Sequence, residues 1–157
     1  MKKLTLTTEK VLAAFNVLST AKYGKLDDAD KIKVWKITRK LKPVAEKFDE
    51  DSKDAAEKMK PTEDFDERLA KAQEYERTIK QTDFDSQKLP MGAAEYGKFI
   101  DEFKAYQKLV DDAIKDFAKK EVEVEIETLS EDAFVNLMVS NDWNMAQVVA
   151  LDGIVTD

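Results

Sequence analysis

One segment of the sequence, KKEVEVEIETLSEDAF at residues 119–134, departs from the helical pattern of the rest. Within it, glutamate alternates with valine or isoleucine over seven positions, from Glu121 to Glu127. Successive side chains of a β-strand point to opposite faces, so this alternation predicts a strand with one apolar and one acidic face. A lone strand leaves backbone N–H and C=O groups unpaired, so a partner strand is required elsewhere in the chain.

The other alternating segment stands near the opposite end of the sequence. In KLTLT, residues 3–7, leucine alternates with lysine and threonine. We therefore predict a small two-stranded ribbon that pairs residues 3–7 with residues 121–127, its apolar face turned toward the rest of the protein.

Apolar residues between these two segments recur every three or four positions, which is typical of amphipathic helices. Four glycines and three prolines in 157 residues leave few loops, so the helices are expected to be long. The clearest apolar stripe steps by three and four through Tyr96, Phe99, Phe103, Tyr106, Val110, Ala113 and Phe117. The sequence predicts a mainly α fold, with a long antiparallel helical bundle or coiled-coil hairpin and the small ribbon.

Several local signals predict where the elements begin and end. Pro43 lies inside the apolar stripe of residues 34–48, which predicts either a bend or two separate helices there. Thr62 is the expected cap of the next helix, with an apolar face that includes Ile79. Ser130 is the expected cap of one C-terminal helix, and Asn141 or Asp142 the expected cap of a second.

The chain length fits one domain of ordinary size, so we predict a single domain over residues 1–157. Its helical body spans residues 8–118 and contains a loop at residues 82–92, where aspartate, serine, proline and glycine gather. A strand and two short helices complete the chain over residues 121–157.

The sequence contains neither cysteine nor histidine. Disulfides, thiolate nucleophiles, Cys/His zinc sites and histidine acid–base catalysis are therefore excluded. The acidic run at residues 49–57 lacks the spacing of a calcium loop, because Asp54 stands where the turn glycine belongs and Lys60 where the final glutamate belongs. We predict a protein without enzymatic activity, cofactor or metal.

No apolar run approaches the roughly 18 residues that a membrane-spanning helix needs. The first residues include two lysines, but threonine and charged residues interrupt any apolar core of a signal peptide. The expectation is a cytoplasmic protein that does not associate with membranes.

Charge is unevenly distributed along a chain of net charge −7. After Lys120 there are nine carboxylates and no lysine or arginine, whereas residues 31–42 hold six basic residues and no acid. The candidate acidic face comprises Glu121, Glu123, Glu125, Glu127, Glu131 and Asp132. The candidate basic face comprises Lys33, Lys36, Arg39 and Lys40, and the candidate apolar docking residues are Trp35, Trp143 and Met145.

Each candidate surface has a structural alternative. Charge on a short ribbon prevents other strands from adding to its edges, so the glutamates either protect an edge or bind a basic partner. The basic helix face either binds a protein, or the chain's own acidic segment, or contacts nucleic acid with Trp35 stacking on a base. The tryptophans and Met145 pack in a core unless they prove exposed.

Three segments carry a resemblance to known proteins: KLTLTTEKVLAAFNVL at residues 3–18, KVWKITRKLKPVAEKF at residues 33–48, and EVEVEIETLSEDAF at residues 121–134. In their order and pattern the chain resembles small uncharacterised, mostly helical proteins of tailed phages and prophages. The resemblance implies a viral origin and a setting in the host-cell cytoplasm, and it implies no activity.

Three functional hypotheses follow from these features. The leading one is a non-enzymatic, phage-derived interaction protein that binds another protein, such as a basic one, through its surface and that can form homo-oligomers. An alternative is an inhibitor of host defence whose acidic face mimics nucleic-acid phosphates. A second alternative is weak nucleic-acid binding through the basic helix of residues 31–42.

Overall fold

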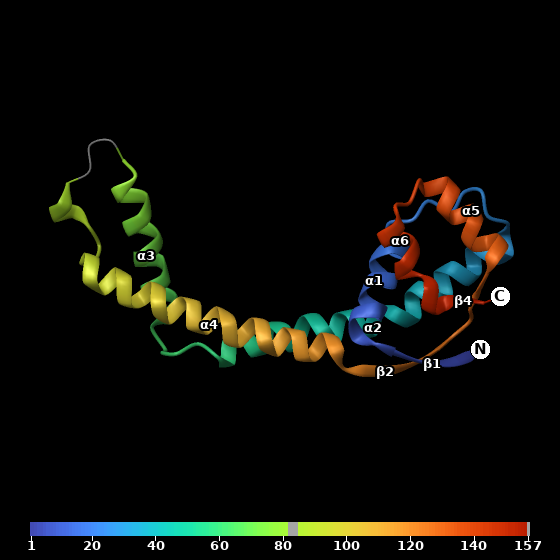
Figure 1. Ribbon diagram of the computed structural model, residues 1–157, viewed down its shortest axis with the longest axis horizontal. Helices are drawn as coiled ribbons and strands as arrows, with labels where there is room; N and C mark the ends of the chain where they lie inside the picture. Colours follow the sequence, from blue (N-terminus) through green and yellow to red (C-terminus); the bar gives the residue numbers. More distant parts are fainter. Residues whose placement is uncertain (82–84, 157) are drawn as a thin grey trace. The chain divides into compact units, whose positions relative to one another are not determined.

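The structure is a computed structural model that describes residues 1–81 and 85–156 (Figure 1). Helix dominates it, which confirms the predicted mainly α class. The α-helices of the described part are α1 (Thr8–Ser19), α2 (Asp28–Lys58), α3 (Phe65–Ile79), α4 (Ala93–Lys119), α5 (Glu131–Asn141) and α6 (Met145–Ala150). The finer description as an antiparallel bundle or coiled-coil hairpin stays a prediction.

A two-stranded antiparallel sheet joins the two alternating segments (Figure 1). Strand β1 (Lys2–Thr7) pairs with β2 (Glu121–Ile126) in a register that sets Lys2 opposite Ile126 and Thr7 opposite Glu121. Val124 and Ile126 of β2 are buried, whereas its glutamates are exposed. The period of two therefore separates an apolar inner face from an acidic outer face.

Hydrogen bonds to one carbonyl oxygen close the end of this sheet. Thr8 donates both its backbone N–H and its hydroxyl to the carbonyl of Lys120, each at 2.8 Å. Thr7 is the cap of α1, because its hydroxyl accepts from the backbone N–H of Lys10 at 3.4 Å. The two adjacent threonines thus fix the start of α1 against the end of α4.

A second pair of strands was not predicted from the sequence. Strand β3 (Leu129–Ser130) pairs in parallel with β4 (Val155–Thr156). The Thr156 hydroxyl also donates to the carbonyl oxygen of Leu129 at 3.2 Å. Ser130 then caps α5, as expected, by accepting from the backbone N–H of Ala133.

The chain forms two compact units. The first unit consists of Met1–Asp51 together with Lys115–Asp157, and the second unit is Ser52–Ile114. Helices α2 and α4 each contribute residues to both units. The predicted single domain over residues 1–157 stays a prediction. The first unit has the larger core, made of Val11, Ala14, Leu18, Leu26, Val34, Ile37, Leu41, Val124, Ile126, Leu129, Ala133, Leu137, Leu151 and Ile154.

An aromatic cluster forms the core of the second unit. Its buried residues are Phe65, Ala72, Tyr75, Met91 and Phe99, from α3, α4 and the segment before α4. The ring of Phe65 lies 5.6 Å from that of Phe99 and 4.8 Å from that of Tyr106, between centroids. These separations are typical of favourable aromatic pairs, so contacts between rings pack the apolar stripe of α4 against α3.

Two predicted helix starts were wrong. Helix α3 begins after Asp64 rather than after Thr62, and the Thr62 hydroxyl donates instead to the Asp64 carboxylate at 2.6 Å. Helix α6 begins after Asn144, which forms a capping box with Gln147. At α6 the capping box fixes the boundary, and Asn141 and Asp142 do not cap this helix. At α3 the cap residue Asp64 makes no side-chain capping hydrogen bond.

Two other predictions concerned interruptions. Helix α2 is continuous through Pro43, so the alternative of two helices was wrong. Of the predicted loop at residues 82–92, residues 82–84 lie outside the described part, Ser86–Lys88 form a 3-10 helix, and Met91 is buried against the aromatic cluster. Ile79, predicted in the buried face of α3, is 41% exposed, and Tyr75 is buried in that helix.

Among the helices of residues 1–81 and 85–156, none is long and apolar enough to cross a membrane.

Candidate functional site

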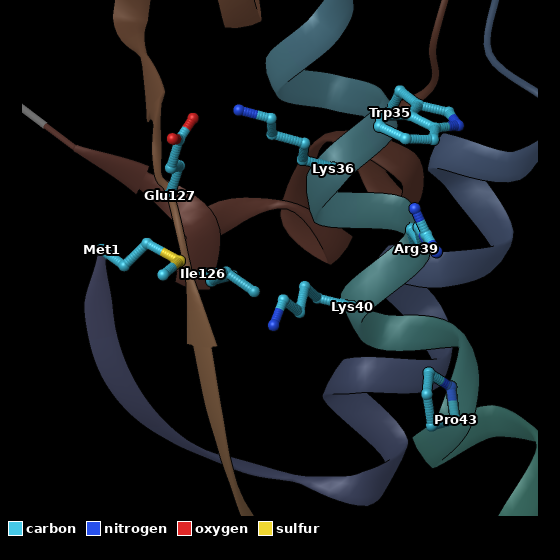
Figure 2. Close-up of a pocket in the computed structure, with 8 residues that line it drawn as sticks. All are labelled: Met1, Trp35, Lys36, Arg39, Lys40, Pro43, Ile126 and Glu127. Atoms are coloured by element: carbon cyan, nitrogen blue, oxygen red, sulfur yellow. The ribbon is translucent and has the colours of Figure 1, made fainter.

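A groove in the first unit brings together residues from α2 and from the end of β2 (Figure 2). Its volume is about 610 Å³, within the range of sites that hold a small ligand or a short segment of a partner. The lining residues are Met1, Trp35, Lys36, Arg39, Lys40, Pro43, Ile126 and Glu127. Apolar and basic side chains thus share one concave surface.

Trp35 is the largest exposed side chain of this groove. The buried face of α2 is formed by residues such as Val34 and Ile37, each 1% exposed, and a helix turns about 100° per residue. Trp35 therefore points away from the core and is 56% exposed. The guanidinium carbon of Arg39 lies 5.3 Å from the centroid of the indole ring, which is a cation–π distance.

Three cations line the groove beside this indole. Lys36 and Lys40 are one helical turn apart on α2, and Arg39 lies beside the Trp35 ring. Figure 2 shows the Lys36 side chain directed toward Glu127 and the Lys40 side chain directed toward Ile126. In residues 1–81 and 85–156 no ion pair engages these three cations or Glu127, so their charges are available to a ligand.

The groove differs from the basic face predicted from sequence. Of that set, Lys36, Arg39 and Lys40 come together with Trp35, whereas Lys33 is half-buried and does not line the groove. Ile126 and Glu127 also line the groove, although Glu127 was predicted to belong to the acidic face. Ile126 is the last residue of β2 and Glu127 follows it, and helical spacing within α2 carries no signal for either residue.

The predicted acidic face is divided into three places. Glu121, Glu123 and Glu125 are exposed on the outer face of β2, about 6.7 Å apart along the strand, opposite Thr7, Thr5 and Lys3 of β1. Glu127 lies in the groove. Glu131 and Asp132 are exposed in the first turn of α5, where carboxylates stabilise the positive end of the helix dipole.

The predicted apolar docking residues are also separated. Trp143 is half-buried and packs against the core of the first unit. Met145, at the start of α6, is 74% exposed, and Val139 of α5 and Val149 of α6 are more than half exposed. Trp35 lies in the groove. Trp143 therefore packs at the edge of the core, whereas Met145, Val139 and Val149 expose apolar side chains on α5 and α6.

The clearest displaced pKa values belong to pairs in the second unit. The Tyr96 hydroxyl donates to the Glu76 carboxylate, and this hydrogen bond raises the pKa of Tyr96 to about 12. The Arg68 guanidinium donates two hydrogen bonds to Glu102, at 2.5 and 3.2 Å, which lowers the pKa of that carboxyl. Each pair links α3 to α4 and stabilises the packing of the aromatic cluster.

In the described residues no three acidic side chains gather closely enough to hold a metal ion. No family model matches the sequence, and neither the curated proteins nor the solved structures give a match to the chain.

Proposed function

We propose that this chain is a non-enzymatic interaction protein that binds another protein through the groove at Trp35. The observation that carries the proposal is the exposed indole beside Arg39 in a concave, partly apolar surface. Tryptophan is highly buried on average in folded proteins. Tryptophan and arginine are also the residues most enriched among those that dominate the binding energy of protein interfaces.

The exposed part of the indole offers a substantial driving force for binding. A tryptophan side chain buries about 150–250 Å², so covering the exposed 56% of Trp35 removes roughly 80–140 Å² from water. At about 25 cal/mol per Å², this area is equivalent to about 2–3.5 kcal/mol before the cost of ordering the partner. A partner residue that covers this ring therefore acts as an anchor.

The resemblance to small phage and prophage proteins supports the further proposal that the chain originates from a tailed phage and meets its partner in the cytoplasm of the host. It is the reason for choosing phage-infected bacterial cells for the test. In those cells Trp35 is replaced by the photo-crosslinking residue p-benzoylphenylalanine, which keeps an aromatic ring in the groove. Leu109 of α4, also 56% exposed, is replaced in the same way as the control.

The proposal predicts a defined protein adduct after irradiation with the crosslinker at position 35, and no such adduct at position 109. Adducts that are the same at both positions, or the absence of any protein adduct at position 35, would contradict it. A second substitution, Arg39→Ala in the crosslinking variant, is expected to weaken the adduct, since it removes the cation that lies on the indole.

A second candidate function uses the outer face of β2. Glu121, Glu123 and Glu125 form a regular row of exposed carboxylates, and their strand partners include one lysine, Lys3. Such a row supports the alternative of a host-defence inhibitor whose carboxylates replace phosphates in a basic groove. Reversing the three glutamates to lysine is then expected to abolish inhibition of a nucleic-acid-binding defence protein without unfolding the chain. Inhibition that survives the reversal excludes this function.

Nucleic-acid binding through the groove is the third candidate. Three cations and an aromatic ring suit a single strand, because bases stack on indole while phosphates meet lysine and arginine. The carboxylate of Glu127 inside the groove and the glutamates that precede it on β2 oppose a longer strand. This candidate requires salt-sensitive retention of DNA or RNA that disappears when Lys36, Arg39 and Lys40 are neutralised. No retention at low salt excludes it.

A further inference from the structure

We infer that the groove at Trp35 accepts an acidic segment of the partner protein that carries one large apolar side chain, and that Glu127 restrains its affinity. The inference rests on the proposed function and assigns the chemistry of the partner. It follows from the charge balance of the groove, from its apolar lining and from the position of one carboxylate.

The charge balance favours an anionic segment. Lys36, Arg39 and Lys40 outnumber Glu127 by three to one, and none of the four forms an ion pair within residues 1–81 and 85–156. Neighbouring cations three and four residues apart on a helix lie about 5–6 Å from one another at their Cβ atoms. Carboxylates that follow each other along a partner segment can therefore pair with successive cations of α2.

The apolar lining of the groove favours a ligand that carries an apolar side chain in addition to carboxylates. Ile126, which is 1% exposed, lies beneath the groove, and Pro43 and Trp35 contribute further apolar surface. An aromatic or large aliphatic side chain that enters here is removed from water together with the indole. Since Arg39 already lies on the Trp35 ring, the cation remains beside the pair and can meet a carboxylate of the same segment.

Glu127 opposes the anion that the rest of the groove attracts. It is half-buried, it follows the last residue of β2, and Figure 2 shows its carboxylate facing the amino group of Lys36. A partner carboxylate that approaches Lys36 is repelled by Glu127. The same carboxylate, together with the exposed Glu125 and Glu123, repels the phosphates of a nucleic-acid strand, which carries a negative charge at every nucleotide. A protein segment can place its few charges on the cations alone.

The test begins without a known ligand. A displayed library of random 12-residue peptides is selected on the intact protein, and in parallel on the Trp35→Ala variant, whose folding is checked by circular dichroism. We expect the enriched peptides to combine two or more acidic residues with a large apolar residue, and to lose retention on Trp35→Ala. Enriched peptides without excess acidic residues, retention that is independent of Trp35, or no enrichment at all would overturn the inference.

The enriched peptide is then titrated into the Trp143→Phe variant, in which Trp35 is the only tryptophan and reports binding by its emission. Lys36→Ala and Lys40→Ala are each expected to weaken binding about 5-fold or more, and Glu127→Gln to strengthen it about 3- to 10-fold. Lys25→Ala, an exposed lysine outside the groove, is the matched control and leaves affinity within about 2-fold. Weaker binding with Glu127→Gln, or an equal loss with Lys25→Ala, refutes the assignment.

A 12-nucleotide oligothymidylate serves as the competing probe in the same emission assay. Tighter binding of this strand than of the peptide at physiological salt would overturn the inference in favour of nucleic acid. A protein adduct at position 35 combined with non-acidic selected peptides refutes the inference and leaves the proposed function standing. Acidic peptides bound in the groove without any cellular adduct refute the proposed function and leave the groove chemistry standing.

Discussion

The side-chain amide of Asn141 joins the N-terminal and C-terminal segments of the first unit through two hydrogen bonds to Lys22. Its side-chain oxygen accepts from the backbone N–H of Lys22 at 2.5 Å, and its amide nitrogen donates to the carbonyls of Lys22 and Leu137, each at 2.8 Å. Asn141→Asp keeps the shape and the accepting oxygen, but replaces the donor with an oxygen that faces two carbonyls. We predict that this isosteric change destabilises the protein more than Asn141→Ala does.

The magnitude follows from the three hydrogen bonds. A typical hydrogen bond contributes about 0.5–1.5 kcal/mol, and those of Asn141 are partly in water. Asn141→Ala is therefore expected to lower the free energy of unfolding by about 1–3 kcal/mol. Asn141→Asp retains one of the three bonds but sets a negative charge against two carbonyl oxygens, which repels them and desolvates the charge. We expect an added loss of about 1 kcal/mol at neutral pH.

The pH dependence separates the two substitutions. Two facing carbonyls disfavour the charged form, so the new carboxyl has a pKa above the ordinary value of about 3.9 in the folded state. The folded variant then binds a proton more tightly than the unfolded chain, so its relative stability recovers as pH falls through that raised pKa. The protonated carboxyl can again donate to a carbonyl. The gap from wild type is expected to narrow on acidification for Asn141→Asp and to stay constant for Asn141→Ala.

Urea unfolding followed by tryptophan emission measures both effects, because the half-buried Trp143 lies two residues beyond Asn141. Asn136→Asp is the matched control, since Asn136 is exposed on the same helix and its side chain is not part of this contact. It should change the free energy of unfolding by no more than about 0.5 kcal/mol. If Asn141→Asp is as stable as wild type at neutral pH, or its deficit grows on acidification, the account of this contact is wrong.

Three further predictions concern the second unit. Phe99→Ala should lower the free energy of unfolding by about 3–5 kcal/mol in urea titrations followed by near-ultraviolet circular dichroism, because Phe99 is buried within the aromatic cluster; a loss below about 1 kcal/mol contradicts this. Tyr96→Phe should remove a step near pH 12 from the phenolate absorbance titration, because the bond to Glu76 raises the pKa of Tyr96 to about 12. The stabilisation from this bond is lost as pH rises from about 10 to about 12. Glu102→Gln should be less stable than wild type at neutral pH and lose that deficit on acidification, because Arg68 lowers the pKa of Glu102 and the stabilisation disappears as pH falls through that lowered value; a deficit that persists at low pH refutes this sign.

Long periodic segments could be predicted from the sequence, because the apolar residues that repeat along them are the ones that face the core. Alternation in residues 121–127 marked the face of β2 that is buried, and the stripe of α2 marked Val34 and Ile37 as core residues. Strands β3 and β4 were missed because a pair of two-residue strands is too short to show any period. Their pairing depends on where the C-terminal segment packs, and no local sequence pattern shows this position.

The apolar stripe of α4 shows how far periodicity can mislead. Seven residues follow the heptad spacing, but Phe99 is the one buried residue of that helix, and Leu109 beside the stripe is 56% exposed. Periodicity predicts a face and leaves its partner open. In the second unit that partner is α3, a helix of 15 residues, which covers the rings near the start of α4.

The part of the groove that lies on α2 could be predicted from the sequence, and the part that comes from the end of β2 could not. Helical spacing groups Lys36, Arg39 and Lys40 on α2, which is local information. The same spacing includes Lys33, which does not line the groove, and it cannot show that Trp35 lines a concave surface whose other side comes from the end of β2. Two segments about 90 positions apart in the sequence build this surface, so only the fold assembles it.

The end of β2 explains why acidic and basic surfaces occur so close together. Along the strand the period of two turns Ile126 inward and Glu125 outward. Glu127 lies one residue beyond the strand, so it leaves the outer row and enters the groove. A uniformly acidic partner would be attracted to Lys36 and Lys40 but repelled by the glutamates of the strand, and a uniformly basic partner would meet the reverse. If the proposed groove binding holds, we expect a partner that is acidic where it enters the groove and basic where it passes the outer face of β2. Such paired charges fix the orientation of binding more than its strength.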